Sequence, residues 1–366
     1  MRSTLDELTG ELTELNTLVK SIGPVNHALE GHEDTMVRQY LSIRRRFDYA
    51  AFVVALYSSF EKFVENLITE YVHLETRRLQ YTELPQKLLK KHLARTAEML
   101  SRGRIGEGRY VGLTEIDVVK NLFECLNGRQ PYTLNKAAVV AHDRNLRISE
   151  IDELFAAVGV EQICTRVRRA DALAEWYRDV NALPSAPRDG VPTATIEERV
   201  KDLVECRNQI AHGRGTPDEL PGVEKMEEAV GFIQALARSI FAITVGQYLR
   251  DHHVGIHLEQ RQGDGPYQKG TVVIIDPPAH RIFRGRPIFA LGKTIGARCG
   301  RIQSLRVDGA DIQEMEANAS APNGVGVGLD FKYPNGADVK LVALQGDDDM
   351  VWSPLESVTD STPSEG

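Results

Sequence analysis

The most constraining feature of this chain is one long run of helical periodicity between Met36 and Arg77. Its apolar residues recur at spacings of three and four, which places them on one face of a helix: Phe52, Leu56, Phe60, Phe63, Leu67 and Tyr71. A continuous helix over this range would exceed 40 residues, and the alternative is a break near Arg46. Either outcome makes helix the main structure of the first part of the chain.

The helical pattern extends from the N-terminus to about Leu249. Leucines at positions 5, 8, 12, 15 and 18 form another apolar stripe. A loop is expected at Asn181–Pro192, where three prolines and an Asp-Gly pair interrupt the pattern. The remaining helices are expected over Gln86–Leu100, Glu115–Leu126, Glu150–Ala157, Val160–Val180, Ile196–Ala211 and Val223–Arg250.

After Asp251 the sequence changes from a helical to a strand-like pattern. Residues 251–270 contain four glycines and one proline and are expected to be a linker. Short apolar segments separated by turn residues then predict a small β-barrel or sandwich: Thr271–Ile275, Arg281–Phe283, Arg298–Val307, Gly326–Phe331 and Val339–Leu344. We expect a multidomain α + β chain with a helical domain at 1–250, this linker, a β-barrel at 271–346 and an acidic flexible tail at 347–366.

Composition excludes several classes of protein. The four cysteines include no CxxC pair, which excludes a zinc ribbon or finger and indicates free thiols in a reducing compartment. The longest apolar run, from Tyr49 to Tyr57, is too short to span a membrane, and acidic residues occupy the place of a secretory signal. We therefore expect a cytoplasmic protein without a membrane-spanning segment.

Charge is unevenly distributed along the chain. The net charge is −8, which argues against binding of nucleic acid by the whole surface. Residues 77–110 nevertheless carry nine Lys and Arg against three Asp and Glu, and residues 261–306 carry nine against two. Residues 307–366 carry two against twelve. Each basic segment is either a polyanion-binding face or a solvated surface that is neutralised within its own domain.

The segment Thr195–Gly213 carries the most informative chemistry. Thr195 and Glu198 have the spacing of a capping box, and Gly213 is typical of a helix C-terminus. Arg207 falls within the apolar stripe of this helix, three and four residues from apolar neighbours on both sides. An arginine at such a position must be paired, reach out to solvent or serve a site, because an unpaired buried charge is costly.

Two polar residues follow Arg207 at the edge of the stripe. Asn208 and His212 are four residues apart, one helical turn above each other. Arginine binds phosphate through its planar fork, and histidine transfers protons near neutral pH. With no metal-ligand cluster beside it, this set suits metal-free RNA cleavage, with Arg207 on the phosphate, His212 as acid or base and Asn208 in an orienting role. The alternative is a packed helix whose Arg and His make interhelical hydrogen bonds.

The string Arg207-Asn-Gln-Ile-Ala-His212-Gly213 resembles the signature of the HEPN superfamily, in which Arg is followed by four to six residues and then His. Three further stretches resemble its MAE-like branch, which is related to the RiboL-PSP type: Tyr57-Ser-Ser-Phe-Glu-Lys-Phe63, Asn135–Leu146 and Leu203–Asn208. The resemblance covers about residues 35–250. It implies an all-helical bundle that acts as a metal-independent endoribonuclease in toxin–antitoxin or antiviral defence systems.

The resemblance also implies an RNA-binding homodimer in which both copies of Arg207 and His212 line one cleft. In some members an acidic residue of the early amphipathic helix approaches the cleft, which makes Glu61 a candidate substrate-binding residue. Arg214, directly after the motif, is a second candidate for a phosphate contact. No cofactor and no metal are expected. The alternative function is a non-catalytic RNA- or partner-binding HEPN module, although such members typically lack the Arg or the His.

The β region has a resemblance of its own. Arg301–Gly309 and Val325–Asp330 are similar to two strands in the second domain of translation GTPases, although the chain contains no P-loop. The resemblance implies a docking module for RNA, such as tRNA or translation-associated RNA. Arg281, Arg284 and Arg286 are the candidate contacts in this module. The alternative is a surface for an antitoxin or a sensor partner.

Overall fold

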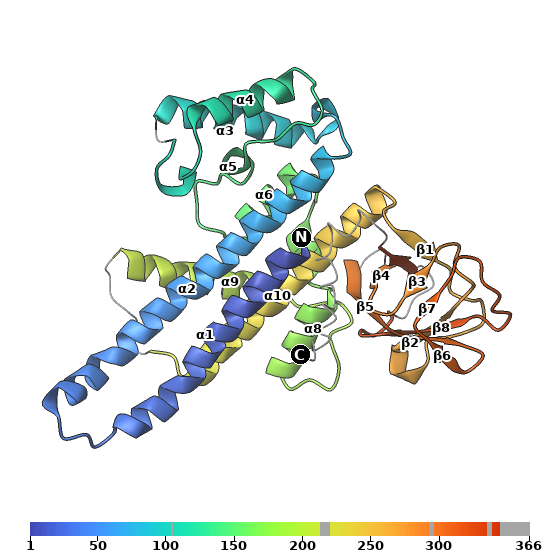
Figure 1. The fold of residues 1–366 in the computed structure, drawn as a ribbon. Helices are drawn as coiled ribbons and strands as arrows, with labels where there is room; N and C mark the ends of the chain where they lie inside the picture. The colour runs from blue at the N-terminus through green and yellow to red at the C-terminus, as the bar shows by residue number, and fades with distance from the viewer. Residues whose placement is uncertain (104, 213–219, 293–295, 335–338, 345–366) are drawn as a thin grey trace, which may run out of the picture. The chain divides into compact units, whose positions relative to one another are not determined.

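The computed structural model describes residues 1–103, 105–212, 220–292, 296–334 and 339–344. In this part of the chain a helical N-terminal region of ten α-helices precedes an antiparallel β half-barrel (Figure 1), which confirms the predicted fold class. The helices are α1 (Arg2–Leu29), α2 (Thr35–Thr76), α3 (Gln86–Arg102), α4 (Glu115–Leu126), α5 (Lys136–Val139), α6 (Ile148–Ala157), α7 (Ile163–Val167), α8 (Asp171–Val180), α9 (Thr193–Ala211) and α10 (Val223–Asp251).

The chain divides into two compact units. Ser3–Thr244 form the helical unit, and the residues from Val245 onward form the β unit together with Met1 and Arg2. The boundary between the units falls within α10, a few residues before the position expected from the sequence.

Helix α2 is the longest element of the helical unit. It runs unbroken for 42 residues, so the long helix is confirmed and the alternative break near Arg46 is not present. Asp34 caps its N-terminus, where a carboxylate oxygen accepts a hydrogen bond from the main-chain N–H of Met36 at 2.8 Å. Its predicted apolar stripe is buried, with Phe60 and Phe63 at 1% and 2% exposure.

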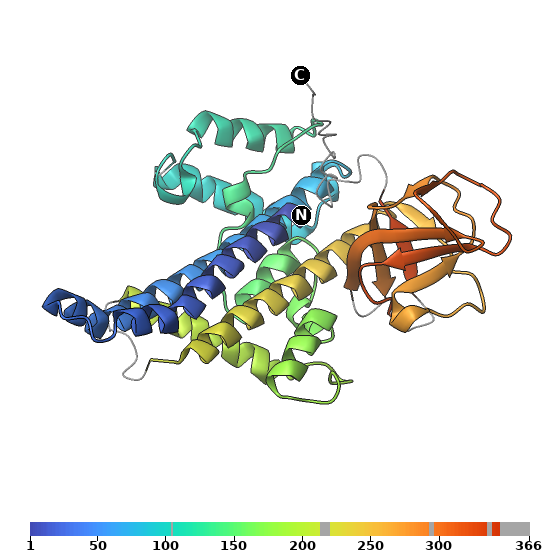
Figure 2. The same ribbon diagram turned by 60° about the horizontal axis from the view of Figure 1, so that its bottom comes forward.

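Helices α1, α9 and α10 are attached along α2. Views from two directions show α1, α2 and the N-terminal part of α10 running side by side (Figure 1, Figure 2). Lys62 of α2 pairs with Glu7 and Glu11 of α1, with N–O distances of 2.6 and 3.0 Å. Arg199 of α9 pairs with Glu228 of α10, and α9 packs against α2. This packing holds the helix with the Arg-Asn-x3-His string beside the middle of α2.

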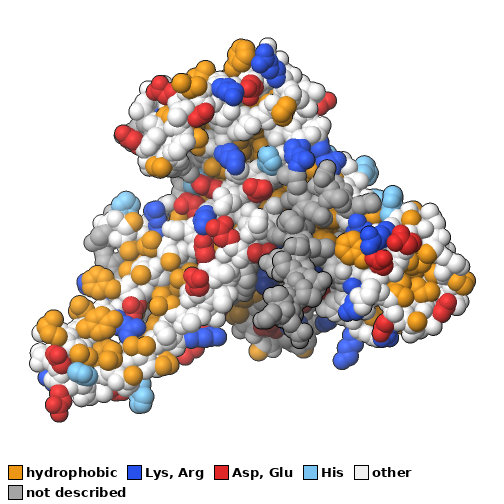
Figure 3. All heavy atoms as spheres, in the orientation of Figure 1, with side chains coloured by type: hydrophobic (Ala, Val, Ile, Leu, Met, Phe, Trp, Pro, Cys, Tyr) orange, Lys and Arg blue, Asp and Glu red, His pale blue; other side chains and the backbone are white. Residues whose placement is uncertain are grey.

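The N-terminal half of α2 also carries an exposed apolar face, which we name the α2 stripe. It is visible as hydrophobic side chains gathered at the end of the helical unit where α2 begins (Figure 3). Its members are spaced by four, three, four and seven residues, as in a heptad pattern: Met36, Tyr40, Ile43, Phe47 and Val54. A contiguous exposed apolar surface of this kind marks an interaction site more often than chance.

A buried polar network joins α3, α4 and α5. The Asn135 side chain donates to the Thr96 hydroxyl and to the Val118 carbonyl, at 3.3 and 3.0 Å. The main-chain N–H of Asn135 donates to Nε2 of His92 at 3.0 Å, and the second ring nitrogen of His92 faces the Tyr81 hydroxyl. Burial lowers the pKa of His92 to about 4. The network fixes the start of the segment that runs from α5 into the candidate site.

The segment 160–180 differs from the single helix expected there. It forms two short helices, α7 and α8, because the chain turns at residues 168–170. Nε of Arg168 donates to the Val191 carbonyl at 2.7 Å, and the N–H of Val191 donates back to the Arg168 carbonyl at 2.9 Å. These long-range bonds, which periodicity does not report, hold the break in place.

Helix α10 is long and apolar enough to cross a membrane by length and composition alone. Within its most apolar window, however, 72% of the residues are buried inside the protein, as they are in a core helix. Tyr248 and Leu249, near its C-terminus, are also buried. We therefore interpret α10 as a core helix that the hydropathy pattern alone does not distinguish from a span.

The β unit is an antiparallel half-barrel around one apolar core. Its main sheet has the order β1-β9-β4-β5-β8-β2, with β6 beside β5, and β3 pairs with β7 in a small second sheet. The strands are β1 (Ile256–Leu258), β2 (Val272–Ile275), β3 (Ile282–Phe283), β4 (Pro287–Gly292), β5 (Gly296–Val307), β6 (Ala310–Ile312), β7 (Glu314–Met315), β8 (Val325–Leu329) and β9 (Lys340–Ala343).

Two parts of the β unit differ from the expected layout. Strand β1 lies inside the segment 251–270 that was expected to be a linker, and it pairs with β9. Gln260 also bridges to Ile275 of β2. Strand β4 was not expected, because all six of its residues are buried and it shows no alternation of polar and apolar residues. The expected tail at 347–366 lies outside the described residues.

Candidate functional site

Helix α9 places the Arg-Asn-x3-His string at its C-terminal end. The helix begins at Thr193 after Pro192, and no side-chain hydrogen bond caps it, so the predicted capping box at Thr195 is wrong. In the middle of the helix, Val200 and Val204 are buried on its inner face. Its last turns are half-buried or exposed, so the apolar stripe ends before the motif. The motif therefore faces the surface of the helical unit.

Arg207 is half-buried on this helix and lies against α2. Its guanidinium carbon is 5.3 Å from the centroid of the Tyr57 ring, a cation–π arrangement. Nη1 donates to the side-chain oxygen of Asn208 at 3.3 Å. Within the described part of the chain, no carboxylate forms an ion pair with Arg207. The guanidinium is thus held in place, and no carboxylate of the described residues neutralises its positive charge.

Asn208 connects the helix to a segment distant in the sequence. Its side-chain oxygen accepts a hydrogen bond from Nδ2 of Asn145 at 2.7 Å, in addition to the bond from Arg207. The side-chain oxygen of Asn145 in turn faces the Tyr57 hydroxyl at 3.4 Å. Two amides therefore bridge α9, α2 and the segment before α6, and they fix the rotamer of Asn208.

Tyr57 is the buried centre of this arrangement, at 1% exposure. Its hydroxyl donates to a Glu61 carboxylate oxygen at 2.8 Å and accepts the main-chain N–H of Leu146 at 3.0 Å. Burial and the neighbouring Glu61 carboxylate raise the pKa of the Tyr57 hydroxyl far above its ordinary value. The hydroxyl therefore stays protonated and acts as a fixed hydrogen-bond partner.

His142 extends the cluster along α2. Its Nε2 faces carboxylate oxygens of Glu65 at 3.0 Å and Glu61 at 3.8 Å, and its Nδ1 faces the Arg144 carbonyl at 2.6 Å. Hydrogen bonding to Glu65 raises the pKa of His142, because both ring nitrogens meet acceptors. These contacts hold residues 142–145 against α2, which positions Asn145.

His212 is the first residue after α9 and is exposed. Its main-chain N–H donates to the Asn208 carbonyl at 2.9 Å and so closes the last helical turn. Among the described residues its imidazole makes no hydrogen bond or ion pair. It lies five positions after Arg207, which corresponds to about 7.5 Å of helix axis. The imidazole is exposed at the same end of α9 that carries Arg207.

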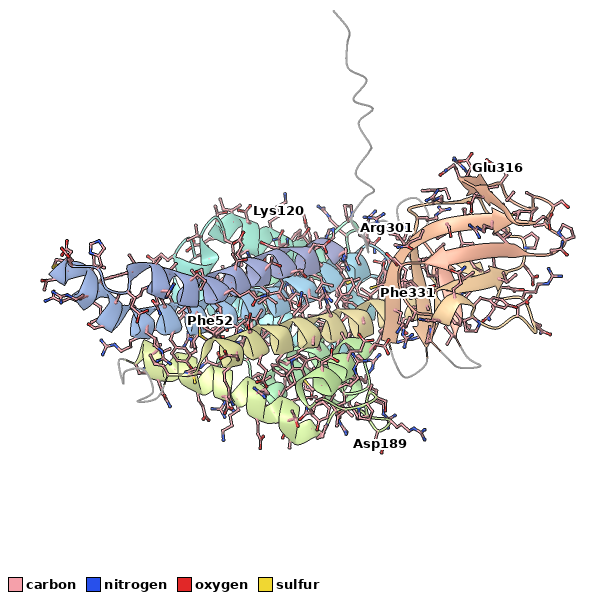
Figure 4. The ribbon with its side chains drawn as sticks, turned by 90° about the horizontal axis from the view of Figure 1, so that it is seen from below. Phe52, Lys120, Asp189, Arg301, Glu316 and Phe331 are labelled. Carbon is pink, nitrogen blue, oxygen red and sulfur yellow. The ribbon has the colours of Figure 1, made fainter. Side chains whose placement is uncertain are left out.

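The other residues predicted for the site lie in three different places. Glu61 lies within the cluster around Tyr57. Arg214 lies outside the described residues. Arg281 is exposed on the β unit and pairs with Glu314 and with Glu316, whose side chain is exposed in Figure 4.

The basic patch expected on the β unit needs one correction, at Arg286. This side chain is only 6% exposed and donates to the carbonyls of Leu344 and Arg281, so it supports the fold and does not face solvent. The Nε of Arg284 donates to the Gln303 carbonyl at 2.8 Å, and this arginine is exposed. A count of charges along the sequence cannot distinguish a buried structural arginine from an exposed one.

The sequence alone gives no role to Tyr57, Glu65, His142 or Asn145. All four belong to the long helix or to the stretch Asn135–Leu146, which was noted only as part of a resemblance. The sequence feature that could have indicated His142 and Asn145 is a run of polar residues between two apolar segments. The two residues are three positions apart in this run. Which residues of α2 they meet depends on tertiary packing.

Comparison with known proteins identifies the family of the helical unit. Residues 6–245, which include the whole cluster from Tyr57 to His212, match the RiboL-PSP-HEPN family. No curated protein matches the chain. The matched region covers well over half of the chain and nearly all of the helical unit. The chain thus belongs to the RiboL-PSP-HEPN family and carries a β half-barrel after its HEPN domain.

Proposed function

We propose that this protein is a metal-independent endoribonuclease. The observation that carries the proposal is the Arg207 guanidinium, which is fixed by Tyr57 and Asn208 but pairs with no carboxylate in the described part of the chain. A positive charge held in this way is prepared for an anion. HEPN domains are commonly ribonucleases, which supports an RNA phosphate as that anion.

The reaction follows from the groups that surround the cation. The 2′-oxygen of the substrate loses its proton and forms a bond to phosphorus, while the bond from phosphorus to the 5′-oxygen breaks and that oxygen takes up a proton. His212 transfers one of these protons, and Arg207 stabilises the negative charge that develops on the phosphate. Asn208 orients Arg207. The products carry a 2′,3′-cyclic phosphate and a 5′-hydroxyl.

A second copy of the chain would complete the cleft. The α2 stripe continues along one helix face toward the site, since Glu61 follows Val54 by seven residues. A partner that covers the stripe would therefore end beside Tyr57 and Glu61. HEPN domains often dimerise, and a two-fold axis at the stripe would bring the two motifs toward one another.

The biological role that fits this activity is that of a toxin or antiviral defence effector. The resemblance of the half-barrel to a translation GTPase domain favours tRNA or translation-associated RNA as the target. The exposed Arg284 is one available phosphate contact on this domain. The other candidate for the half-barrel is a surface for an antitoxin or sensor.

The experiment that tests the proposal is RNA cleavage by the full chain in the presence of EDTA. Arg207→Ala and His212→Ala should each lower the rate about 100-fold or more. Gln209→Ala, an exposed residue of the same helix, is the matched control and should cleave normally. Strict dependence on Mg²⁺ would contradict the mechanism. RNA binding without cleavage by the wild type would instead support a non-catalytic binding module.

A further inference from the structure

One face of α9 continues from the candidate site toward the N-terminus of the helix. Lys201, Glu205, Asn208 and His212 are spaced by four, three and four residues, so they follow one another along this face. We name this surface the α9 face. The helix is continuous over its whole length and ends at the C-cap His212. A polymer that leaves the site along the helix in this direction therefore passes Glu205 and Lys201.

A cation from another segment joins the α9 face. Arg147 precedes α6 and lies two positions after Asn145, whose side chain bonds to Asn208 at 2.7 Å. Nη2 of Arg147 lies 3.6 Å from a carboxylate oxygen of Glu205, and Nζ of Lys201 lies 3.9 Å from the same oxygen. The segment that carries Asn145 thus also brings a positive charge to the α9 face.

The two cations of the α9 face outnumber the carboxylate with which they pair. Both pair with Glu205, so one positive charge is left in excess. The two N–O distances are longer than a hydrogen bond, and among the described residues the side chains of Arg147 and Lys201 donate no hydrogen bond. These side chains are 48% and 57% exposed. Their N–H donors are therefore open to an anion from solvent.

The charge and the length of the α9 face fit the backbone of RNA. Lys201 lies seven positions before Asn208, which corresponds to about 10.5 Å of helix axis. At about 3.4 Å per nucleotide in a helical strand, this length covers about three nucleotides. Arginine and lysine side chains that contact phosphates hold a strand in register without reading its bases.

We propose that the RNA strand on one side of the cleaved phosphate lies along the α9 face, where Arg147 and Lys201 bind its phosphates. This inference rests on the proposed function, because it extends the substrate from the phosphate at Arg207 to the nucleotides beside it. Glu205 opposes this binding, since its negative charge lies beside both cations. Recognition along the face is electrostatic, independent of base sequence and weakened by salt.

Binding of a decanucleotide with 2′-O-methyl groups tests the proposal without cleavage, because its 2′-oxygens are blocked. The affinity of the full chain is measured at several salt concentrations. Arg147→Ala and Lys201→Ala should each lower the salt dependence by about one unit of slope, equally for oligo(A) and oligo(U). Glu205→Gln should have the opposite effect and bind about twofold more tightly. Lys20→Ala is the matched control, because Lys20 of α1 is 62% exposed and pairs with Glu227 at 3.6 Å, and it should bind like the wild type.

Cleavage of two substrates separates this inference from the proposed function. A dinucleotide contains only the cleaved phosphate, so Arg147→Ala and Lys201→Ala should cleave it like the wild type. With an unmodified decanucleotide, both variants should have a KM raised several-fold and an unchanged kcat. The expected binding responses without any cleavage by the wild type would overturn the proposed function and leave the α9 face assigned to RNA. Salt slopes that are unchanged in both variants would overturn the assignment of the α9 face, with or without cleavage.

Discussion

The guanidinium carbon of Arg207 lies 5.3 Å from the centre of the Tyr57 ring, and the hydroxyl of the same tyrosine bonds to Glu61 and to the Leu146 main chain. One buried side chain thus supports the candidate phosphate-binding cation with its face and holds two other parts of the site with its hydroxyl. An aromatic face does not neutralise the cation as a carboxylate would, and within the described residues no carboxylate pairs with Arg207, so the charge is available for the substrate phosphate that we propose.

The two functions of Tyr57 can be separated by substitution. Tyr57→Phe keeps the ring below Arg207 but leaves the buried N–H of Leu146 without its acceptor. The free energy of unfolding should fall by about 1–3 kcal/mol, as measured by urea titration. Tyr177→Phe, on α8, is the control, because the Tyr177 hydroxyl forms no hydrogen bond with the described residues, and it should change the free energy of unfolding little. An unchanged stability in Tyr57→Phe would show that the buried hydroxyl does not support the site.

Two histidines should give the helical unit opposite pH dependences. The raised pKa of His142 means that its stabilising contribution is complete below the ordinary value of 6.5 and is lost as pH rises through its folded-state pKa. The pKa of His92 is lowered from 6.5 to about 4, so the unfolded state binds the proton more readily and stability is lost as pH falls from 6.5 toward 4.

Urea unfolding followed by helix circular dichroism checks these slopes across the pH range. In His142→Gln the free energy of unfolding should decrease less as pH rises above neutral. Its decrease at acid pH should be the same as in the wild type. His280→Gln, at an exposed position of the β unit, is the control and should alter neither slope. A wild-type stability that rises steadily from pH 6.5 to 8 would be inconsistent with a charged, carboxylate-bound His142.

Dimerisation should depend on the α2 stripe. Phe47 is 58% exposed at its centre, and Phe47→Glu would place charges in the apolar contact between two copies. Sedimentation at micromolar concentration should give twice 40.8 kDa for the wild type and 40.8 kDa for the variant, with much slower RNA cleavage. Leu93→Glu alters an exposed leucine of α3 outside the stripe and should remain dimeric. A monomeric variant with full activity would exclude a cleft shared by two copies.

Two neighbouring arginines should differ in their effect on the β unit. Arg286 is buried and bonds to two carbonyls, so Arg286→Ala should destabilise the half-barrel by several kcal/mol. Arg284 is exposed, and Arg284→Ala should change stability little. Thermal unfolding compares the stability of the two variants.

If RNA contacts the half-barrel, Arg284→Ala should also lower the salt dependence of RNA binding by about one unit of slope. Equal stability of the two variants would contradict the structural role of Arg286.

The long elements of the fold could be predicted because their periodicity is strong. Helix α2 follows from its apolar spacing alone, whereas β4 is apolar on both faces and lacks any alternation. The break between α7 and α8 depends on bonds between Arg168 and Val191, which are distant in sequence. Local patterns contain no information about such partners.

The candidate site was predictable only in part, for the same reason. Arg207, Asn208 and His212 lie on one short string, so their position at one helix end follows from spacing. Tyr57 and Asn145 are separated by 88 positions, and only the packing of α9 and the segment before α6 on α2 brings them together. The sequence therefore indicates the candidate catalytic groups, and the structure identifies which residues contact Arg207 and Asn208.

The most direct test of the central claim is cleavage of an RNA in which a single nucleotide at a mapped cleavage site carries 2′-hydrogen in place of 2′-hydroxyl. The nucleophile we propose is then missing, while the phosphate and the bases are unchanged. The wild-type protein in EDTA should cleave the unmodified RNA to 2′,3′-cyclic phosphate and 5′-hydroxyl ends and should leave the substituted position intact. Cleavage of the substituted position at an undiminished rate would contradict 2′-hydroxyl attack and the roles of Arg207 and His212 that depend on it.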